Sequence, residues 1–280
     1  MLFAAILTIG CLPEPLPIGD IPQLKSKIVV STQLIPDQSL VVLLTRSVGA
    51  LDVSDDSDPE ELLNQIAIND ALVILESTDS YDTLDFIENG LYAITQLQVS
   101  PNEVYTLHIE SETHGSVKAI TRAMPVTSFI SVSAEIFDTG FDTLATIDYA
   151  LEDLAGPNYY MINVQRVTLD SAQLPEPEDF LNPTIFTHLF TDEGIIDGSL
   201  INDSFTAFFR RDFIPGDTVM IQLANISPEY FNFLQLRLDT RFNFAEFLGE
   251  PVNFPSNVEG GLGWFTLHIP DIQIRRVEQQ

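Results

Sequence analysis

Positive charge is scarce in this chain of 280 residues, which has 12 Lys and Arg against 41 Asp and Glu. The formal net charge is -29 and the isoelectric point is about 4.1. Such a surface repels phosphate, which argues against nucleic-acid binding and against attachment to anionic lipid headgroups by charge. Because the acidic residues are spread over predicted loops and strand faces, we interpret them first as a source of solubility.

Catalytic motifs are lacking as well. The sequence has no H-E-x-x-H pair, no G-x-S-x-G elbow and no phosphate-binding loop ending in Gly-Lys-Ser/Thr. Of the 4 histidines, His108 and His268 lie within strand patterns, where a packed or surface imidazole is the ordinary role. We therefore expect a non-enzymatic protein that uses no cofactor.

Cysteine occurs once, at Cys11, which excludes an internal disulfide. The apolar run from Leu2 to Gly10 before it resembles the end of a bacterial lipoprotein signal. We predict that residues 1–10 are a signal peptide, and because no Lys or Arg precedes the run, either its n-region is missing or the true start lies upstream. Cys11 would then carry lipid, and the Pro-rich residues 11–24 would form an extended tether. The alternative is a buried N-terminal strand with an inert cysteine.

Helical periodicity is rare, and short β patterns dominate. Runs such as "KIVVSTQLI" (27–35) and "SLVVLLTRSV" (39–48) are β-branched and flank a turn signal, which predicts an antiparallel hairpin. The stretch 103–112, "EVYTLHIESE", alternates between a polar and an apolar face. We predict an all-β fold of tandem sandwich domains, with an N-terminal Ig-like β-sandwich at 25–124 and a second β-rich domain at 125–280.

The second domain contains one convincing helix, predicted near 227–239. Ser227 is an N-cap candidate and Pro228 occupies the first helical position. The segments "SFTAFFRRDF" (204–213) and "TVMIQLANI" (218–226) are predicted to form a hairpin. Near the end, "SNVEGGLGWF" (256–265) has no Lys-Ser/Thr and precedes a strand pattern. We expect its glycines to provide turns or a close approach to another backbone, not a phosphate site.

Two acidic clusters could bind a cation through oxygen. Residues 52–61, "DVSDDSDPEE", lack the glycine and spacing of a calcium-binding loop, so a solvated loop is favoured. Asp192 and Asp197 lie beside glycines in "FTDEGIIDGS" (190–199), where tight turns are the favoured interpretation and a metal role is the minor one. We therefore predict no metal site, with these two aspartates as the weak candidates.

Aromatic residues crowd the second domain, and most fall on core positions. The segment 241–254, "RFNFAEFLGEPVNF", is different, because neither a helical nor a strand period places all its phenylalanines on one face. If some are exposed, they would form a patch for a protein partner or a ligand. The candidates are Phe242, Phe244, Phe247, Phe254 and Trp264.

Several stretches occur in an order that resembles one family. "SKIVVSTQL", "DALVILE", "VYTLHIE", "NYYMINV", "FTDEGIIDGS" and "PVNFPSNVEGGLGWF" are similar to the sequence of the DUF4249 family of Bacteroidota envelope proteins, and the resemblance runs from Cys11 to Ile269. It implies a lipoprotein with an N-terminal sandwich that is transthyretin-like (carboxypeptidase regulatory-like) and a second β-rich domain, encoded beside TonB-dependent outer-membrane receptors. It implies no catalytic residues.

We therefore expect an outer-membrane lipoprotein, anchored through Cys11, that assists a TonB-dependent transporter by binding the receptor or its cargo. One alternative is a surface adhesin or structural spacer. Another is a periplasmic hydrolase accessory, which would need a polar cluster such as Asp192 and Asp197 with His188 in one pocket.

Overall fold

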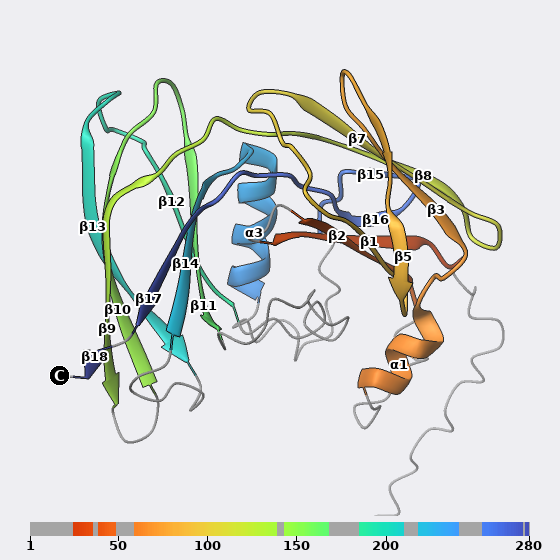
Figure 1. The fold of residues 1–280 in the computed structure, drawn as a ribbon, viewed down its shortest axis with the longest axis horizontal. Helices are drawn as coiled ribbons and strands as arrows, with labels where there is room; N and C mark the ends of the chain where they lie inside the picture. The colour runs from red at the N-terminus through yellow and green to blue at the C-terminus, as the bar shows by residue number, and fades with distance from the viewer. Residues whose placement is uncertain are drawn as a thin grey trace, which may run out of the picture.

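Two β-sandwiches stand side by side in the computed structural model (Figure 1). It describes residues 25–35, 39–48, 59–138, 143–167, 185–209, 218–240, 254–276 and 278–279. The predicted all-β fold class is thereby confirmed. The predicted signal peptide, Cys11 and the tether lie outside the described residues.

The first sandwich packs a sheet of order β16-β1-β2-β6-β5 on a sheet of order β15-β8-β7-β3-β4. On β7 the side chains of Tyr105, Leu107 and Ile109 are buried and those between them face outward, as the sequence alternation predicts. The strands are β1 (Ile28–Ile35), β2 (Ser39–Arg46), β3 (Ala71–Glu76), β4 (Tyr81–Thr83), β5 (Asp85–Glu88), β6 (Leu91–Ile94), β7 (Val104–Ser111), β8 (Gly115–Arg122), β15 (Val258–Glu259) and β16 (Leu262–Trp264).

The second sandwich packs a sheet of order β13-β10-β9-β18 on a sheet of order β12-β11-β14-β17. Its core combines aliphatic residues of both sheets with Tyr149 and Tyr160. The strands are β9 (Phe129–Asp138), β10 (Thr143–Glu152), β11 (Tyr159–Val167), β12 (Phe186–Thr191), β13 (Leu200–Phe209), β14 (Thr218–Asn225), β17 (Asp271–Arg276) and β18 (Glu278–Gln279). The predicted hairpin of 204–213 with 218–226 is wrong, since β13 pairs with β10 and β14 pairs with β11 and β17.

The glycine-rich segment belongs to the first sandwich, not to the second domain as the division at 125 expects. β16 runs parallel to β1, and β15 pairs with β8. Phe265 and Leu267 complete the first core. A Cβ on Gly263 would overlap the backbone of Val30, and one on Gly261 would lie 2.7 Å from the Ile28 carbonyl. The predicted role of these glycines, close approach to another backbone, is confirmed.

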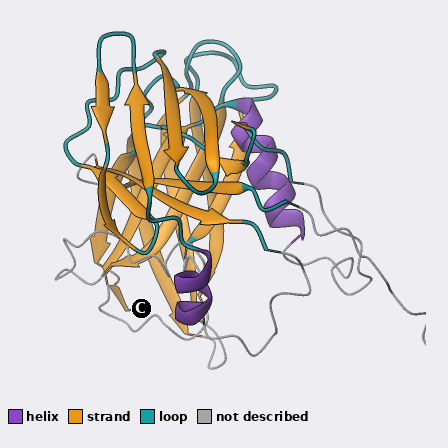
Figure 2. Ribbon diagram, turned by 90° about the vertical axis from the view of Figure 1, so that its right-hand side faces the viewer, coloured by secondary structure: helices purple, strands orange, loops and turns teal. Residues whose placement is uncertain are grey.

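Two helices, α1 and α3, accompany the sheets within the described residues (Figure 2). The helix predicted near 227–239 is α3 (Pro228–Thr240), and the Ser227 hydroxyl accepts the Tyr230 N–H at 3.2 Å as its N-cap. The helix α1 (Pro59–Ile66) was not predicted, and it begins within the predicted acidic loop of residues 52–61. Leu63 of α1 is buried against β2 and β6, so packing on the sheet stabilises this short helix.

The helix α3 lies between the two sandwiches (Figure 1). On one side, Phe231 and Leu234 pack on β11 and β14 of the second sandwich. On the other side, Phe233 stacks on Trp264 with ring centroids 4.9 Å apart, and Tyr230 contacts the ring of His268. The helix therefore joins both sandwiches through apolar contacts, which restricts their relative motion.

Candidate functional site

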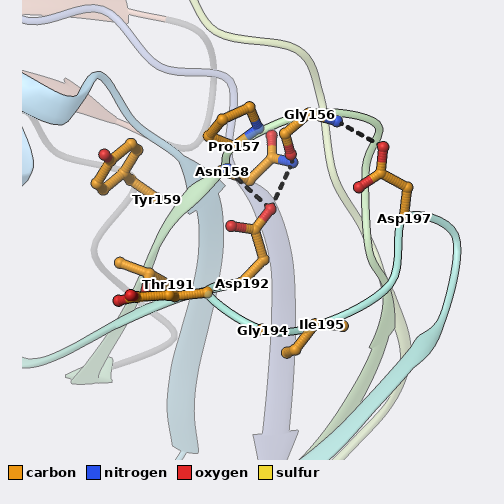
Figure 3. A pocket seen from close by; sticks show the side chains of 10 residues that line it. Gly156, Pro157, Asn158, Tyr159, Thr191, Asp192, Gly194, Ile195 and Asp197 are labelled. Atoms are coloured by element: carbon orange, nitrogen blue, oxygen red, sulfur yellow. Dashed lines mark hydrogen bonds between the residues drawn. The ribbon is translucent and has the colours of Figure 1, made fainter.

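A hollow of about 450 Å³ opens at one end of the second sandwich (Figure 3). Two loops form it: residues 153–158 join β10 to β11, and residues 192–199 join β12 to β13. Loops held at the end of a rigid sandwich are the usual place for recognition residues. The second of these loops is the "FTDEGIIDGS" stretch that the sequence analysis singled out.

The loop 192–199 consists of two successive β-turns. The Ile195 N–H donates to the Asp192 carbonyl at 2.8 Å, and the Ser199 N–H donates to the Ile196 carbonyl at 2.9 Å. The third residue of each turn is a glycine with positive φ, 83° at Gly194 and 76° at Gly198. The predicted tight turns are confirmed.

The side chains of Asp192 and Asp197 fasten this loop to its neighbour (Figure 3). Asp192 Oδ2 accepts the backbone N–H of Asn158 at 2.8 Å and its side-chain amide at 3.0 Å. Asp197 Oδ2 accepts the Gly156 N–H at 3.0 Å. Within the described residues, no three His, Cys, Asp or Glu side chains form a group that could hold a metal ion. The two aspartates therefore hold the 192–199 loop to the backbone of the 153–158 loop through hydrogen bonds.

Asp153, the first residue of the 153–158 loop, is a buried carboxylate that was not predicted from the sequence. Its side chain is only 3% exposed, and Oδ1 accepts the Tyr160 hydroxyl at 2.8 Å. Oδ2 has no hydrogen-bond partner. Burial raises the pKa of the Asp153 carboxyl, and the charges of Asp192 and Asp197 raise it further. The signal available in the sequence was Tyr160 near the start of a predicted strand, since in β-sandwiches such a tyrosine hydroxyl bonds back to the backbone a few residues earlier.

His188 is not part of the hollow. Its ring lies 4.2 Å from the ring of Phe205 and 5.5 Å from that of Phe190, with the planes nearly parallel, so it belongs to an aromatic cluster inside the second sandwich. Burial lowers the pKa of His188. The structure thus brings Asp192 and Asp197 to one hollow and places His188 elsewhere, so these three residues do not share one pocket.

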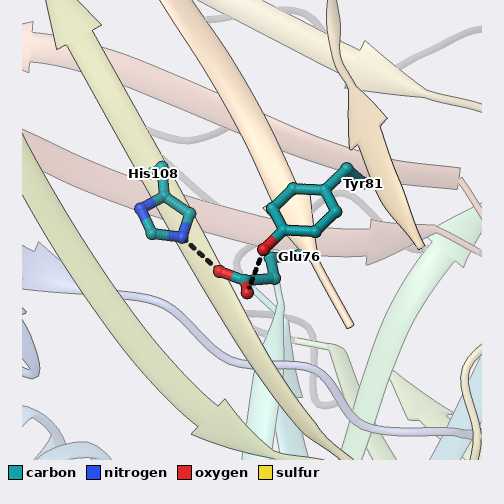
Figure 4. A network of polar contacts seen from close by, with 3 residues as sticks. All are labelled: Glu76, Tyr81 and His108. Carbon is teal, nitrogen blue, oxygen red and sulfur yellow. Dashed lines mark hydrogen bonds and ion pairs between the residues drawn. The ribbon is translucent and has the colours of Figure 1, made fainter. Parts of the chain in front are cut away.

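A second polar group lies on the first sandwich (Figure 4). The Glu76 carboxylate accepts the Tyr81 hydroxyl at 2.5 Å and lies 2.6 Å from His108 Nε2. The Tyr81 hydroxyl and then His108 lower the pKa of Glu76. The chain of contacts from tyrosine to carboxylate to histidine resembles a catalytic relay, but these side chains project from the outward face of a sheet and do not line the hollow of the second sandwich. We interpret them as cross-strand surface pairs.

The predicted aromatic patch divides between described and undescribed residues. Phe242, Phe244 and Phe247 lie outside the described residues. Phe254 is partly exposed and meets the edge of Phe233, whereas Trp264 is buried against α3. The proposal of an exposed role for Trp264 is therefore corrected, because the helix already covers its ring.

Within the described residues, no helix has the length and apolar character that a membrane span requires.

The strand orders and the fastened loops define a tandem β-sandwich protein with a loop-built hollow at one end. The chain belongs to the DUF4249 family, a domain of unknown function, whose profile matches residues 15–268. The predicted family membership is confirmed. The comparison with curated proteins found no match.

Two solved structures of fibronectin type III domains are similar in part. The chicken CNTN1 FN1–FN3 domains share 8% identity with a TM-score of 0.25, covering 90% of this chain and 67% of that one. A segment of two fibronectin type III domains from chicken tenascin shares 11% identity with a TM-score of 0.22, covering 72% of this chain and 91% of that one. At these scores the fold assignment depends on the strand pairing described above.

Proposed function

We propose that this chain is a non-enzymatic binding protein of the cell envelope. It is held to the outer membrane by lipid on Cys11 and assists a TonB-dependent transporter by binding the receptor or its cargo. The chain belongs to the DUF4249 family, and the support for this setting is that the resemblance to this family implies an envelope lipoprotein encoded beside such receptors. The Cys11 signal supports the anchor.

The observation that carries the binding role is the use of Asp192 and Asp197. Both carboxylates hold backbone N–H groups of the neighbouring loop, so they fix the shape of a surface. A carboxylate that acts as an acid, a base or a metal ligand needs free oxygens directed at a common point with its partners. A fixed loop at the end of a rigid sandwich suits recognition of another molecule.

The junction between the sandwiches supports the same role. The stacked rings of Phe233 and Trp264, with the return of β15 and β16 to the first sandwich, join the two units. A membrane tether that enters at the first sandwich would then hold the loops of the second at a fixed distance and orientation. An accessory protein needs this geometry to meet a partner in the same membrane.

Co-purification tests the proposal. The chain is tagged at its C-terminus, native envelopes are solubilised in mild detergent, and the retained proteins are identified by mass spectrometry. We expect a TonB-dependent receptor in near-equal amount. The matched control is Cys11→Ser, which removes the lipid-bearing thiol and should move the protein from the membrane fraction to the soluble fraction. Recovery of the lipidated chain alone would contradict a stable complex.

A further inference from the structure

An isoleucine pair projects from the loop 192–199. Ile196 is 79% exposed and Ile195 is 37% exposed. They occupy the join between the two β-turns, at the tip of the loop. Single exposed apolar residues are common, but an exposed pair on a fixed loop is a feature that marks an interaction surface.

The loop that presents this pair is fixed from several directions. Asp192 and Asp197 bond the backbone of residues 156–158. At the base of the loop, the Asp153 N–H donates to the Ser199 carbonyl at 2.9 Å, and the Gly198 N–H donates to the Asp153 carbonyl at 3.2 Å. A loop already held in one shape loses little conformational freedom on binding, so its contacts contribute more fully to affinity.

The charge around the pair is of one sign. Asp192, Glu193 and Asp197 line the hollow beside it, and none of the described residues that line the hollow is basic. A complementary surface would have an apolar socket for Ile196 with lysine or arginine at its border, and one such side chain would fit into the acidic hollow.

We propose that the 192–199 loop is the docking element of this protein, and that its occupant is a protein surface with an apolar socket bordered by lysine or arginine. The proposal depends on the non-enzymatic binding role above and names the partner's chemistry for that role. A lipid bilayer is the weaker occupant, because insertion of Ile196 would bring three carboxylates against the headgroups, and anionic headgroups would repel them.

Site-specific photocrosslinking tests the docking element in native envelopes. A benzophenone side chain replaces Ile196 in the full-length lipidated chain. In a matched control it replaces Ile274, which is 51% exposed on β17, at the edge of the second sandwich's β12-β11-β14-β17 sheet that lies opposite β12. Crosslinked peptides are identified by mass spectrometry. We expect position 196 to give one dominant protein adduct, in a peptide that combines apolar residues with lysine or arginine, at a yield at least about ten-fold above that of position 274.

Charge reversal sharpens the test. Glu193→Lys leaves the Asp192 and Asp197 bonds in place, and we expect it to lower the adduct yield from position 196 at least about five-fold. A circular-dichroism melt that matches the wild type shows that the loss is not unfolding. An unchanged yield would contradict the charge complementarity on which the proposal depends.

The outcomes separate this proposal from the transporter role. A basic, apolar adduct on a TonB-dependent receptor supports both proposals, and the same adduct on another protein supports docking and overturns the transporter role. A receptor that co-purifies but crosslinks equally from positions 196 and 274 leaves the transporter role and overturns docking through this loop. No adduct from position 196, or adducts only with lipid, also overturns it.

Discussion

Each sandwich has a tyrosine near the start of a central strand whose hydroxyl accepts a hydrogen bond from a backbone N–H a few residues earlier. In the first, Tyr105 accepts from Ser100 at 2.8 Å and donates to Glu103 at 3.0 Å. In the second, Tyr160 accepts from Leu154 at 3.1 Å and donates to Asp153 at 2.8 Å. The two corners have the same design, in which the tyrosine hydroxyl joins a backbone N–H to a carboxylate.

The surroundings shift the pKa values of the two carboxylates, Glu103 and Asp153, in opposite directions. Glu103 is open to water and also accepts the Thr78 N–H at 2.9 Å, and these bonds lower its pKa. Asp153 is buried, has one oxygen without a partner, and has a raised pKa. A buried, incompletely paired carboxylate opposes folding. Asp153 lies at the base of the 192–199 loop, so this end of the second sandwich was not optimised for stability alone.

The largest expected effect comes from a substitution that disrupts the first sandwich, where β16 pairs with β1. Gly263→Ala places a Cβ into the backbone of Val30 at a residue with φ of 97°, so we expect a loss of about 4 kcal/mol in the free energy of unfolding. The single Trp264 reports the junction by fluorescence during denaturation. Gly115→Ala is the control, since its Cβ meets open space at a φ of 85°, and should cost about 1 kcal/mol. Equal losses would show that β16 is not needed to close the first sandwich.

The next effect compares the two corners directly. Tyr160→Phe removes the hydroxyl that accepts the Leu154 N–H and donates to buried Asp153, so we expect a cost of about 3 kcal/mol. Tyr105→Phe should cost about 1.5 kcal/mol, because Glu103 is exposed and keeps its bond from Thr78. Urea denaturation of both variants gives the two free energies. A larger cost at Tyr105 would reverse the comparison.

Acid should weaken the junction between the sandwiches. His268 is 8% exposed, its Nδ1 has no partner, and burial lowers its pKa from 6.5 to about 4. Between these values the unfolded chain binds a proton that the folded chain does not, so stability falls as the pH falls below 6.5. The loss at pH 5 should be about 2 kcal/mol. His268→Phe should remove this part of the pH dependence, and an unchanged slope would assign it to other groups.

The smallest effect differs in sign between the corners. Asp153→Asn keeps an acceptor for Tyr160 and removes a buried charge close to Asp192 and Asp197, so we expect a gain of about 1 kcal/mol at pH 7. The gain should vanish in acid, where Asp153 is neutral. Glu103→Gln should instead be mildly destabilising at pH 7, because the folded state favours its charged form. Thermal melts at two pH values distinguish the signs.

Local pattern was enough to predict many strands and the antiparallel hairpin of β1 with β2, but not the pairing of segments that are distant in sequence. The alternation in 103–112 gave both faces of β7, and Ser227 with Pro228 placed the start of α3. By contrast, the pairing of Val29 with Leu262 joins segments that no periodicity connects. The predicted hairpin of 204–213 with 218–226 failed for the same reason, since nearness in sequence was mistaken for pairing across a sheet.

The site was predictable in shape and not in role. The glycines of "FTDEGIIDGS" indicated the turns, and the aspartates were correctly noted beside them. Which atoms those aspartates bind depends on Gly156 and Asn158, which come from a different loop. The burial of Asp153 likewise depends on strands that are distant in sequence, so a charged residue that looked ordinary became the least satisfied carboxylate of the loop end.

The return of β15 and β16 to the first sandwich also sets an order of events in time. Thr32 on β1 bonds the backbone at Trp264 and Thr266, 232 and 234 residues further along the chain. At ordinary rates of synthesis this interval lasts roughly 10 to 50 seconds, during which most of the second sandwich is made while β1 and β8 each have an unpaired edge. Such edges invite pairing with other chains, so a folding chain has reason to be guarded until its end emerges. The sandwich that is begun first therefore stays incomplete until β15 and β16 are made, shortly before β17 and β18 complete the second.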